Sequence, residues 1–428
     1  ELPDRTSDKR QDNYRTMTKK IILLLSLLSS ISHTAMAQNN KILANNIASL
    51  SVMAGENWLG MPVTSLGGEP IRINFDELSH DYHRYTYRIE HCDADWTPSE
   101  GLFASDYIQG FYDDNTIDDY QQSLSTYQLF THYSLTIPND KLRLTMSGNY
   151  RLTVLDDNND NKPVLVACFM ICENTAGIKF RVITDTDADI NGRHQQLNME
   201  VSYGNLDVTA PQEQLHTVVL QNHRWDNAVY NPRSQFTMRD GLRWEHCREL
   251  IFLAGNEYHK FETLDPTHTT MGLASVGWDN INSQWHAYVE PDYPQKNYTY
   301  DVDANGSFLI RNSDNTDNAI MSDYILTHFE LHAPRQKGPV YLSGVWTNGE
   351  LTPQYEMKWN DETQVYENTV MLKQGYYSYR YLVLNSDGTL SSISSEGNFF
   401  ETENRYDVLL YFRAPGDRAD RLVGYSHN

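Results

Sequence analysis

The sequence has little of what marks a nucleic-acid binder, a disulfide scaffold or a membrane-spanning protein. Only 4 of its 428 residues are cysteine, too few for a disulfide framework in a chain of this length. Lysine and arginine number 34 against 57 aspartate and glutamate, and no basic run is present to hold nucleic-acid phosphates. The net charge of −23 therefore argues against nucleic acid and anionic lipid surfaces as partners.

Long apolar runs are also scarce, and the one that stands out lies near the start of the chain. Two lysines precede an apolar stretch over 21–31, and an A-M-A tripeptide ends at Ala37. This order is typical of a secretory signal peptide. We interpret 17–37 as that signal, 1–16 as upstream residues, and the bond from Ala37 to Gln38 as the cleavage site. Because no later segment approaches the length of a transmembrane helix, we expect an exported protein without a membrane span.

Sequence motifs of the common enzyme classes are absent too. The chain has no nucleophile elbow, no H-E-x-x-H zinc motif, no phosphate-binding P-loop and no G-x-G-x-x-G fingerprint. Its four cysteines, Cys92, Cys168, Cys172 and Cys247, include no C-x-x-C pair, and we interpret them as small buried residues. We therefore predict a protein that is not an enzyme and needs no cofactor.

Aromatic side chains and short alternating segments are abundant. Aromatic residues make up 12% of the chain, and apolar residues recur at every second position between turn residues. This pattern predicts antiparallel strands, so the expected fold class is all-β, a tandem of immunoglobulin-like β-sandwiches. A short helix is expected only over 119–127. The clearest alternating segments are Ile71–Phe75, Tyr85–Ile89, Tyr133–Ile137, Tyr150–Val154, His216–Leu220, Tyr341–Val345 and Tyr377–Tyr381.

Two polar stretches, over 173–177 and 312–318, indicate where one domain ends and the next begins. We expect an immunoglobulin-like β-sandwich over 45–173, a middle β-sandwich over 177–313 and a third β-sandwich over 320–428. The third ends in a charged tail, which we expect to lie across a partner or a neighbouring domain.

An acidic loop near the end of the middle domain partly matches a calcium-binding loop. Asp301, Asp303 and Asn305 stand at the positions of the first calcium ligands. Asn312 takes the place of the bidentate glutamate, and a β-turn at Asn305-Gly306 accounts for the same residues. Outside such loops we predict no metal site.

Two further groups of polar residues could either bind a metal ion or belong to a turn. The first group lies in a second acidic loop. The second group alternates along a segment that, if it continues a strand, presents three metal ligands on one face. If the strand ends there instead, the aspartates cap the backbone of a turn. The groups are Asp185, Asp187 and Asp189, and His91, Asp93 and Asp95.

Two of the expected domains resemble known sandwich modules. The first resembles immunoglobulin-like sensor modules in Tyr85–Glu90 with Trp96, and in Ser147–Val154. The third resembles starch- and glycogen-binding modules in Val340–Trp346, Tyr366–Leu372 and Gly375–Tyr381. The second resemblance implies that Trp346 and Trp359 stack on sugar rings; the alternative is that they fill the core of the sandwich.

Almost the whole exported part of the chain is similar to the plug proteins of the type IX secretion system, a family of the Bacteroidetes. The matching segments are Tyr87–Trp96, Gln221–Ala228, Gly255–Tyr258, Lys373–Tyr377, Glu396–Asn404 and Pro415–Gly424. The resemblance implies a periplasmic protein that binds the outer-membrane translocon barrel and closes it when no substrate passes. The alternative function is that of a glycan-binding periplasmic or surface protein.

The signal-peptide interpretation makes a direct prediction about the exported protein. We expect the mature chain to begin at Gln38 and to carry no lipid, because the residue after the cleavage site is not cysteine. Intact-mass measurement on protein from the native host checks this. A mass that retains residues 17–37, or an added diacylglyceryl group, would contradict it.

Overall fold

The alternating segments form strands in the part of the chain that the computed structural model describes, residues 40–428. All but one of these segments lie wholly within strands. The exception is Tyr341–Val345, which extends beyond the end of its strand at Ser343 and into η2 (Val345–Thr347). The all-β fold class is confirmed. The helix expected over 119–127 is wrong, because β8 (Asp119–Gln122) occupies its first half. The predicted signal peptide and the cleavage site at Ala37 and Gln38 lie outside the described residues.

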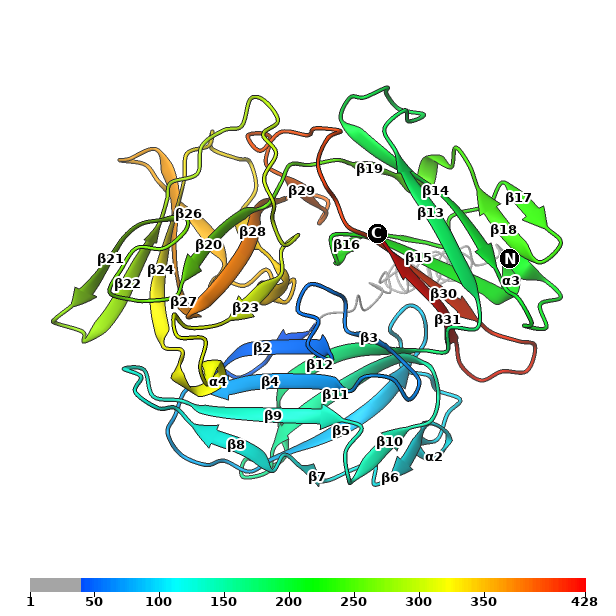
Figure 1. Ribbon diagram of the computed structural model, residues 1–428, viewed down its shortest axis with the longest axis horizontal. Coiled ribbons are helices and arrows are strands. Elements are labelled where there is room, and N and C mark those ends of the chain that lie inside the picture. The colour runs from blue at the N-terminus through cyan, green and yellow to red at the C-terminus, as the bar shows by residue number, and fades with distance from the viewer. Residues whose placement is uncertain (1–39) are drawn as a thin grey trace, which may run out of the picture. The chain divides into compact units, whose positions relative to one another are not determined.

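The first sandwich packs two antiparallel sheets face to face (Figure 1). One sheet has the order β1 (Lys41–Ile42), β12 (Lys162–Cys172), β11 (Gly148–Asp156), β5 (Tyr85–Cys92) and β7 (Asn115–Thr116), with β3 (Val63–Ser65) parallel to β12. The other has the order β2 (Ile47–Ala54), β4 (Ile71–Glu77), β9 (Thr131–Ile137) and β8. Beside them lie α2 (Ala104–Tyr107) and the pair β6 (Ile108–Gly110) and β10 (Leu142–Leu144).

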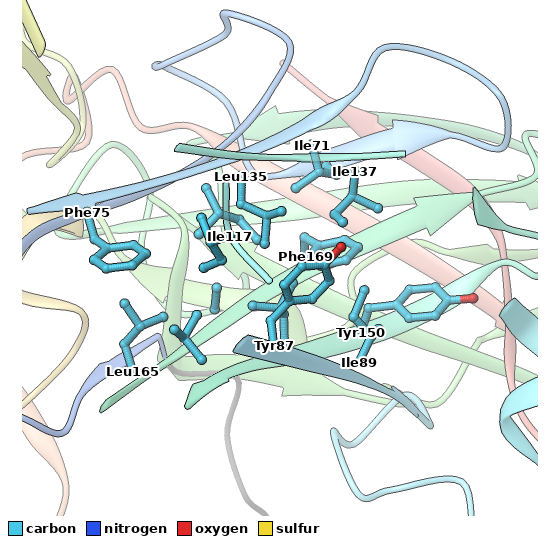
Figure 2. Packing of buried hydrophobic residues seen from close by; sticks show 14 of the residues in the cluster. Ile71, Phe75, Tyr87, Ile89, Ile117, Leu135, Ile137, Tyr150, Leu165 and Phe169 are labelled. Carbon is cyan, nitrogen blue, oxygen red and sulfur yellow. The ribbon is translucent and has the colours of Figure 1, made fainter. Parts of the chain in front are cut away.

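The core of the first sandwich follows directly from the period of two. Every second residue of β4 and β9 points inward, so Ile71 and Ile137 lie across the sandwich from the rings of Tyr87 and Phe169 (Figure 2). These side chains are buried, and burial of apolar surface on this scale is what holds the two sheets together.

The middle sandwich is built from two stretches of chain that lie far apart in the sequence. One sheet contains β13 (Gly177–Ile183), β14 (His194–Ser202), β18 (Gly241–Trp244) and β17 (Phe236–Met238), with β19 (Ile251–Leu253) beside β14. The other has the order β16 (Arg224–Tyr230), β15 (Leu215–Gln221), β30 (Tyr406–Phe412) and β31 (Arg421–His427). α3 (Pro211–Gln214) and η1 (Arg248–Leu250) complete it.

The third sandwich is one continuous strand path that folds over a ring-rich core. Its order is β20 (His259–Thr263), β28 (Gly375–Leu384), β25 (Val340–Ser343), β26 (Glu356–Asn360), β27 (Val365–Lys373), β24 (Tyr324–Leu331), β22 (Gln284–Val289) and β21 (Leu273–Asp279). β23 (Phe308–Ile310) and β29 (Leu390–Ser392) also pair with β28, and α4 (Asn318–Met321) precedes β24.

The strand pairing does not follow the domain boundaries expected at 313 and 320. β20 to β23, which the sequence assigned to the middle sandwich, belong to the third. Residues 406–427, called the returning tail below, were assigned to the third sandwich from the sequence, but they form β30 and β31 of the middle one. Polar loops show where strands end but not which strands pair. The sequence therefore predicts a separate third domain, whereas the structure shows that the third sandwich is inserted in the middle one.

The returning tail makes a prediction about stability. Leu410 of β30 is fully buried in the core of the middle sandwich, so Leu410→Ala should lower the free energy of unfolding by about 2–5 kcal/mol. Leu253→Ala, on an exposed leucine of the same sandwich, is the matched control and should cost much less. Urea denaturation measures both. Equal effects would mean that the tail is not part of this core.

Candidate functional site

The structure places the residues of the candidate calcium loop in roles other than metal binding. A turn lies at Asn305-Gly306, and Asp303 accepts the backbone N–H groups of Asn305 (2.6 Å) and Tyr258. The ammonium group of Lys260 lies 2.6 Å from Asp301, where a cation would otherwise sit. Burial raises the pKa of Asp303 to about 6.

The other two groups do not converge either. Asp189 accepts a hydrogen bond from the backbone N–H of Arg193 and contacts His194. Asp187 accepts a hydrogen bond from the side-chain amide of Gln196. β5 ends at Cys92, so the residues after it leave the strand as a turn. Among residues 40–428, no three His, Cys, Asp or Glu side chains are grouped closely enough to hold a metal ion.

The two tryptophans of the third sandwich differ in exposure. Trp346 is 6% exposed, packs against Phe329, Tyr355 and Tyr377, and therefore has no open face for a sugar ring. Trp359 is half-buried; the guanidinium of Arg335 lies 5.9 Å from the centre of its ring. The core interpretation therefore holds for Trp346, and the glycan-stacking interpretation of that residue is wrong.

What the structure does bring together is a set of contacts between the sandwiches. At the first joint, between the first and third sandwiches, the Lys373 ammonium group lies 2.5 Å from the Asp76 carboxylate and 4.0 Å from the centre of the Phe130 ring. Tyr324 donates to the same carboxylate at 2.7 Å, and His132 contacts its other oxygen at 2.6 Å. The side chains of Lys373 and Asp76 are only 2% and 1% exposed.

The electrostatics of the first joint show that its charges depend on one another. Burial alone would raise the pKa of Asp76, but Lys373 and His132 more than offset it and hold the pKa below its usual range. Burial lowers the pKa of Lys373, and Asp76 opposes that effect. Removing either partner would leave a buried charge without compensation, which costs several kcal/mol.

Two other features lie along the contact between the first and third sandwiches. The carboxylate of Asp323 accepts the backbone N–H groups of Tyr127 (2.7 Å) and Gln128 (3.0 Å), and the Tyr127 ring packs 4.5 Å from that of Trp278. A cleft of about 500 Å³ lies here as well, and residues from both sandwiches line it. They include Ser49, Leu50, Tyr324, Glu350 and Gln354.

The second joint, between the first and middle sandwiches, is an apolar core with a charged rim. The rings of Trp96 and Trp225 meet edge to face at 5.5 Å within this core. At the rim, Asp93 pairs with Arg413 at 3.0 Å, and Asp420 accepts the backbone N–H of Ala94. Other members of the core are Met61, Cys92, Cys168, Met170, Cys172, Val218, Leu220, Leu409, Tyr411 and Leu422.

The third joint consists of the two chain segments that enter and leave the third sandwich. Asn404 donates to the carbonyl of Ala254 (2.7 Å) and to the side chain of Gln195 (3.0 Å). Gln195 in turn donates to the carbonyls of Phe400 and Thr402. Because all these polar groups are buried or half-buried and satisfied, the two segments are fixed to each other and to β14.

A charged histidine holds one of these segments against the third sandwich. His259 lies 2.8 Å from Asp292 and 3.2 Å from Glu396, which belongs to the segment leaving the sandwich. Burial alone lowers the pKa of His259, but the two carboxylates raise it to about 10. The hydroxyl groups of Tyr379 and Tyr381 donate to Asp292 and complete the network.

Sequence reasoning missed nearly all of these joint residues. Asp93 and Trp96 drew attention as a turn exit after a clear strand, and Cys92, Cys168 and Cys172 as small buried residues. An isolated lysine, histidine or asparagine gives no local signal that it is buried between domains. Lys373 and Asp76 stand on the faces of their strands that point away from each sandwich core, where charged residues are ordinary, so their burial between the sandwiches leaves no signal in the sequence.

Comparison with known proteins identifies the family of the chain. The sequence profile of the type 9 secretion system plug protein 1st domain matches residues 47–173. The chain is also similar to a solved structure described as a hypothetical protein from Parabacteroides merdae ATCC 43184, with 35% identity and a TM-score of 0.88. That match covers 92% of this chain and 99% of the other. The chain therefore belongs to the type 9 secretion system plug protein family.

Two further comparisons add nothing to this assignment. Trypsin-activated alpha-2-macroglobulin from Escherichia coli is 10% identical, with a TM-score of 0.15, over 91% of this chain and 24% of that protein. This value is too low to indicate a shared fold. No curated protein matches the chain.

The histidine network predicts a specific pH dependence. A raised pKa means that His259 stabilises the fold fully below its unfolded value, near 6.5, and that this contribution is lost as the pH rises toward about 10. The difference in free energy of unfolding between wild type and His259→Gln should therefore be largest at pH 6 and shrink as the pH rises. His268→Gln, on an exposed histidine, is the control. A pH-independent difference in urea denaturation would refute the charged network.

Proposed function

We propose that this protein is a non-enzymatic plug subunit that closes the periplasmic opening of the type IX outer-membrane translocon barrel while no substrate is in transit. The observation that carries the proposal is membership of the plug family, through a first domain matched over 47–173. The resemblance over nearly the whole exported chain supports the same assignment for the other two sandwiches.

The joints supply the mechanical property that a plug needs. The first sandwich contacts the third through buried charges and the middle one through an apolar core, and satisfied polar groups fix together the two segments that link the middle and third sandwiches. A body fixed at three places cannot open at one joint without straining the others. It therefore keeps its width when substrate or osmotic pressure pushes on it.

A plug must also leave the pore when a substrate arrives, which limits how it binds. A reversible contact is moderate in area and polar at its rim rather than obligate and wholly apolar. The net charge of −23 favours an opening lined by lysine and arginine, and such attraction acts mainly on the rate of association. Electrostatic attraction of this kind weakens at high salt.

Deletion of the gene in the native host tests the proposal. The outer membrane should become permeable to large antibiotics, because an unplugged translocon is a wide hole, while secretion continues. Re-expression of the wild-type chain should restore the barrier. In parallel, tagged protein should co-purify with a very large barrel from detergent-solubilised outer membrane. Unchanged permeability together with lost growth on a polysaccharide would favour the glycan-binding function instead.

A further inference from the structure

We propose that the outer edge of β21, at Ser275–Trp278, is a docking site at which an extended, uncharged segment of a partner protein pairs as an additional strand. This inference deepens the proposed function, on which it rests for the partner being the translocon. The juxtaposition that carries it is an open strand edge beside an exposed cluster of apolar side chains.

The edge is open along the second half of the strand. β21 ends the strand path of the third sandwich: it pairs with β22 on one side, and no other described strand pairs with its other side. Its start is covered, since Gly272 lies against the backbone of Lys260 and Phe261. After a register shift between Leu273 and Ser275, the pairing with β22 is regular, so the outward N–H and C=O groups form a template for another strand.

This edge carries no charged side chain before its last residue, Asp279. Proteins commonly guard an exposed edge with charged side chains. β16 carries Arg224 and Asp226, and β8 begins with Asp119. The chain has no charged residue from Thr269 to Trp278, although its net charge is −23. An unguarded edge in so acidic a protein is what a site for strand addition requires.

Side chains on both faces of the edge provide places for the side chains of an added strand. On one face, Gly277 stands opposite His286, and a Cβ at Gly277 would meet no atom within 4 Å, which leaves a shelf beside the rings of His286 and Tyr288. On the other face, Trp278 packs against Tyr127 of the first sandwich, and Tyr127 is 63% exposed. A strand that alternates apolar side chains would use both faces.

The cluster continues past the strand into the turn that follows. Ile281 is 91% exposed there, the highest value for any large apolar residue between 40 and 428. Leu124 and Leu129, from the same loop as Tyr127, are exposed as well. Through the contact of Trp278 with Tyr127, the edge adjoins the first sandwich, so an added strand would lie beside both sandwiches.

Charge indicates that the occupant is a partner rather than a second copy of this chain. Edge-to-edge pairing of two copies would bring together two bodies of net charge −23, which repel each other. An uncharged or basic segment meets no such repulsion. Main-chain hydrogen bonds would provide the affinity. The shelf at Gly277 and the rings of Tyr127 and Trp278 would select the side chains of the added strand.

Binding of a synthetic strand to the full exported chain tests the site. The probe is a short peptide in which threonine alternates with valine and tryptophan, and its control is the same peptide with proline at central positions, which removes ladder donors. We expect saturable binding of the first peptide alone, with slowed amide exchange at 275–279. Ser275→Lys should weaken binding about tenfold because a charge guards the edge. Gln121→Lys, on the exposed edge of β8, is the matched control and should bind like wild type.

Several results would overturn the inference. Equal binding of both peptides, or unchanged binding to Ser275→Lys, would show that the edge is not used. A wild-type dimer that Ser275→Lys separates into monomers would assign the edge to a second copy. In the native host, the Ser275→Lys strain should be permeable to large antibiotics. If the outer membrane stays impermeable in the Ser275→Lys strain but becomes permeable in the deletion strain, the docking site is refuted and the plug function stands. If it stays impermeable in the deletion strain as well, the plug function itself is refuted.

Discussion

The pairing of β15 with β30 is the interaction on which the rest of the molecule depends. It joins residues 215–221 to residues 406–412 and so completes the middle sandwich with the end of the chain. The same returning strands present Leu409, Tyr411 and Leu422 to the first sandwich and place Arg413 beside Asp93. Without that pairing, the second joint would lose three of the thirteen buried residues of its apolar core, together with the rim contacts of Arg413 and Asp420.

The joints use different physical means, and the difference has a reason. An apolar contact such as the second joint supplies free energy but little direction, because hydrophobic burial is non-directional. A buried ion pair such as Lys373 with Asp76 supplies little net free energy, since desolvation of the two charges offsets their attraction. The contacts of the pair with Phe130, His132 and Tyr324 instead fit only one arrangement of the two sandwiches. The second joint thus supplies most of the free energy of association between sandwiches, and the first and third joints fix their relative orientation.

Local patterns in the sequence predicted the strands and the fold class well. Segments such as Ile71–Phe75 and Tyr377–Tyr381 carry their own signal, because every second side chain must be apolar for a sheet to bury one face. The family resemblance likewise rested on residues that can be seen in the sequence, and the match over 47–173 agrees with it. The pairing of β30 with β15 could not be predicted, since any apolar strand satisfies the same local pattern. Buried polar residues such as Gln195 and Asn404 were equally invisible, because their partners come from distant segments.

The insertion of the third sandwich between β19 and β30 sets an order for folding. The first sandwich contains only contacts between residues 41 and 172 and can form as soon as that stretch is available. The middle sandwich must wait for β31 at the end of the chain, and closing so long a loop is slow. The joints with the middle sandwich therefore form last. A chain whose last strands are not yet available therefore has a folded first sandwich but not the complete body, and loss of those strands alone would leave the first sandwich as an independent folded unit.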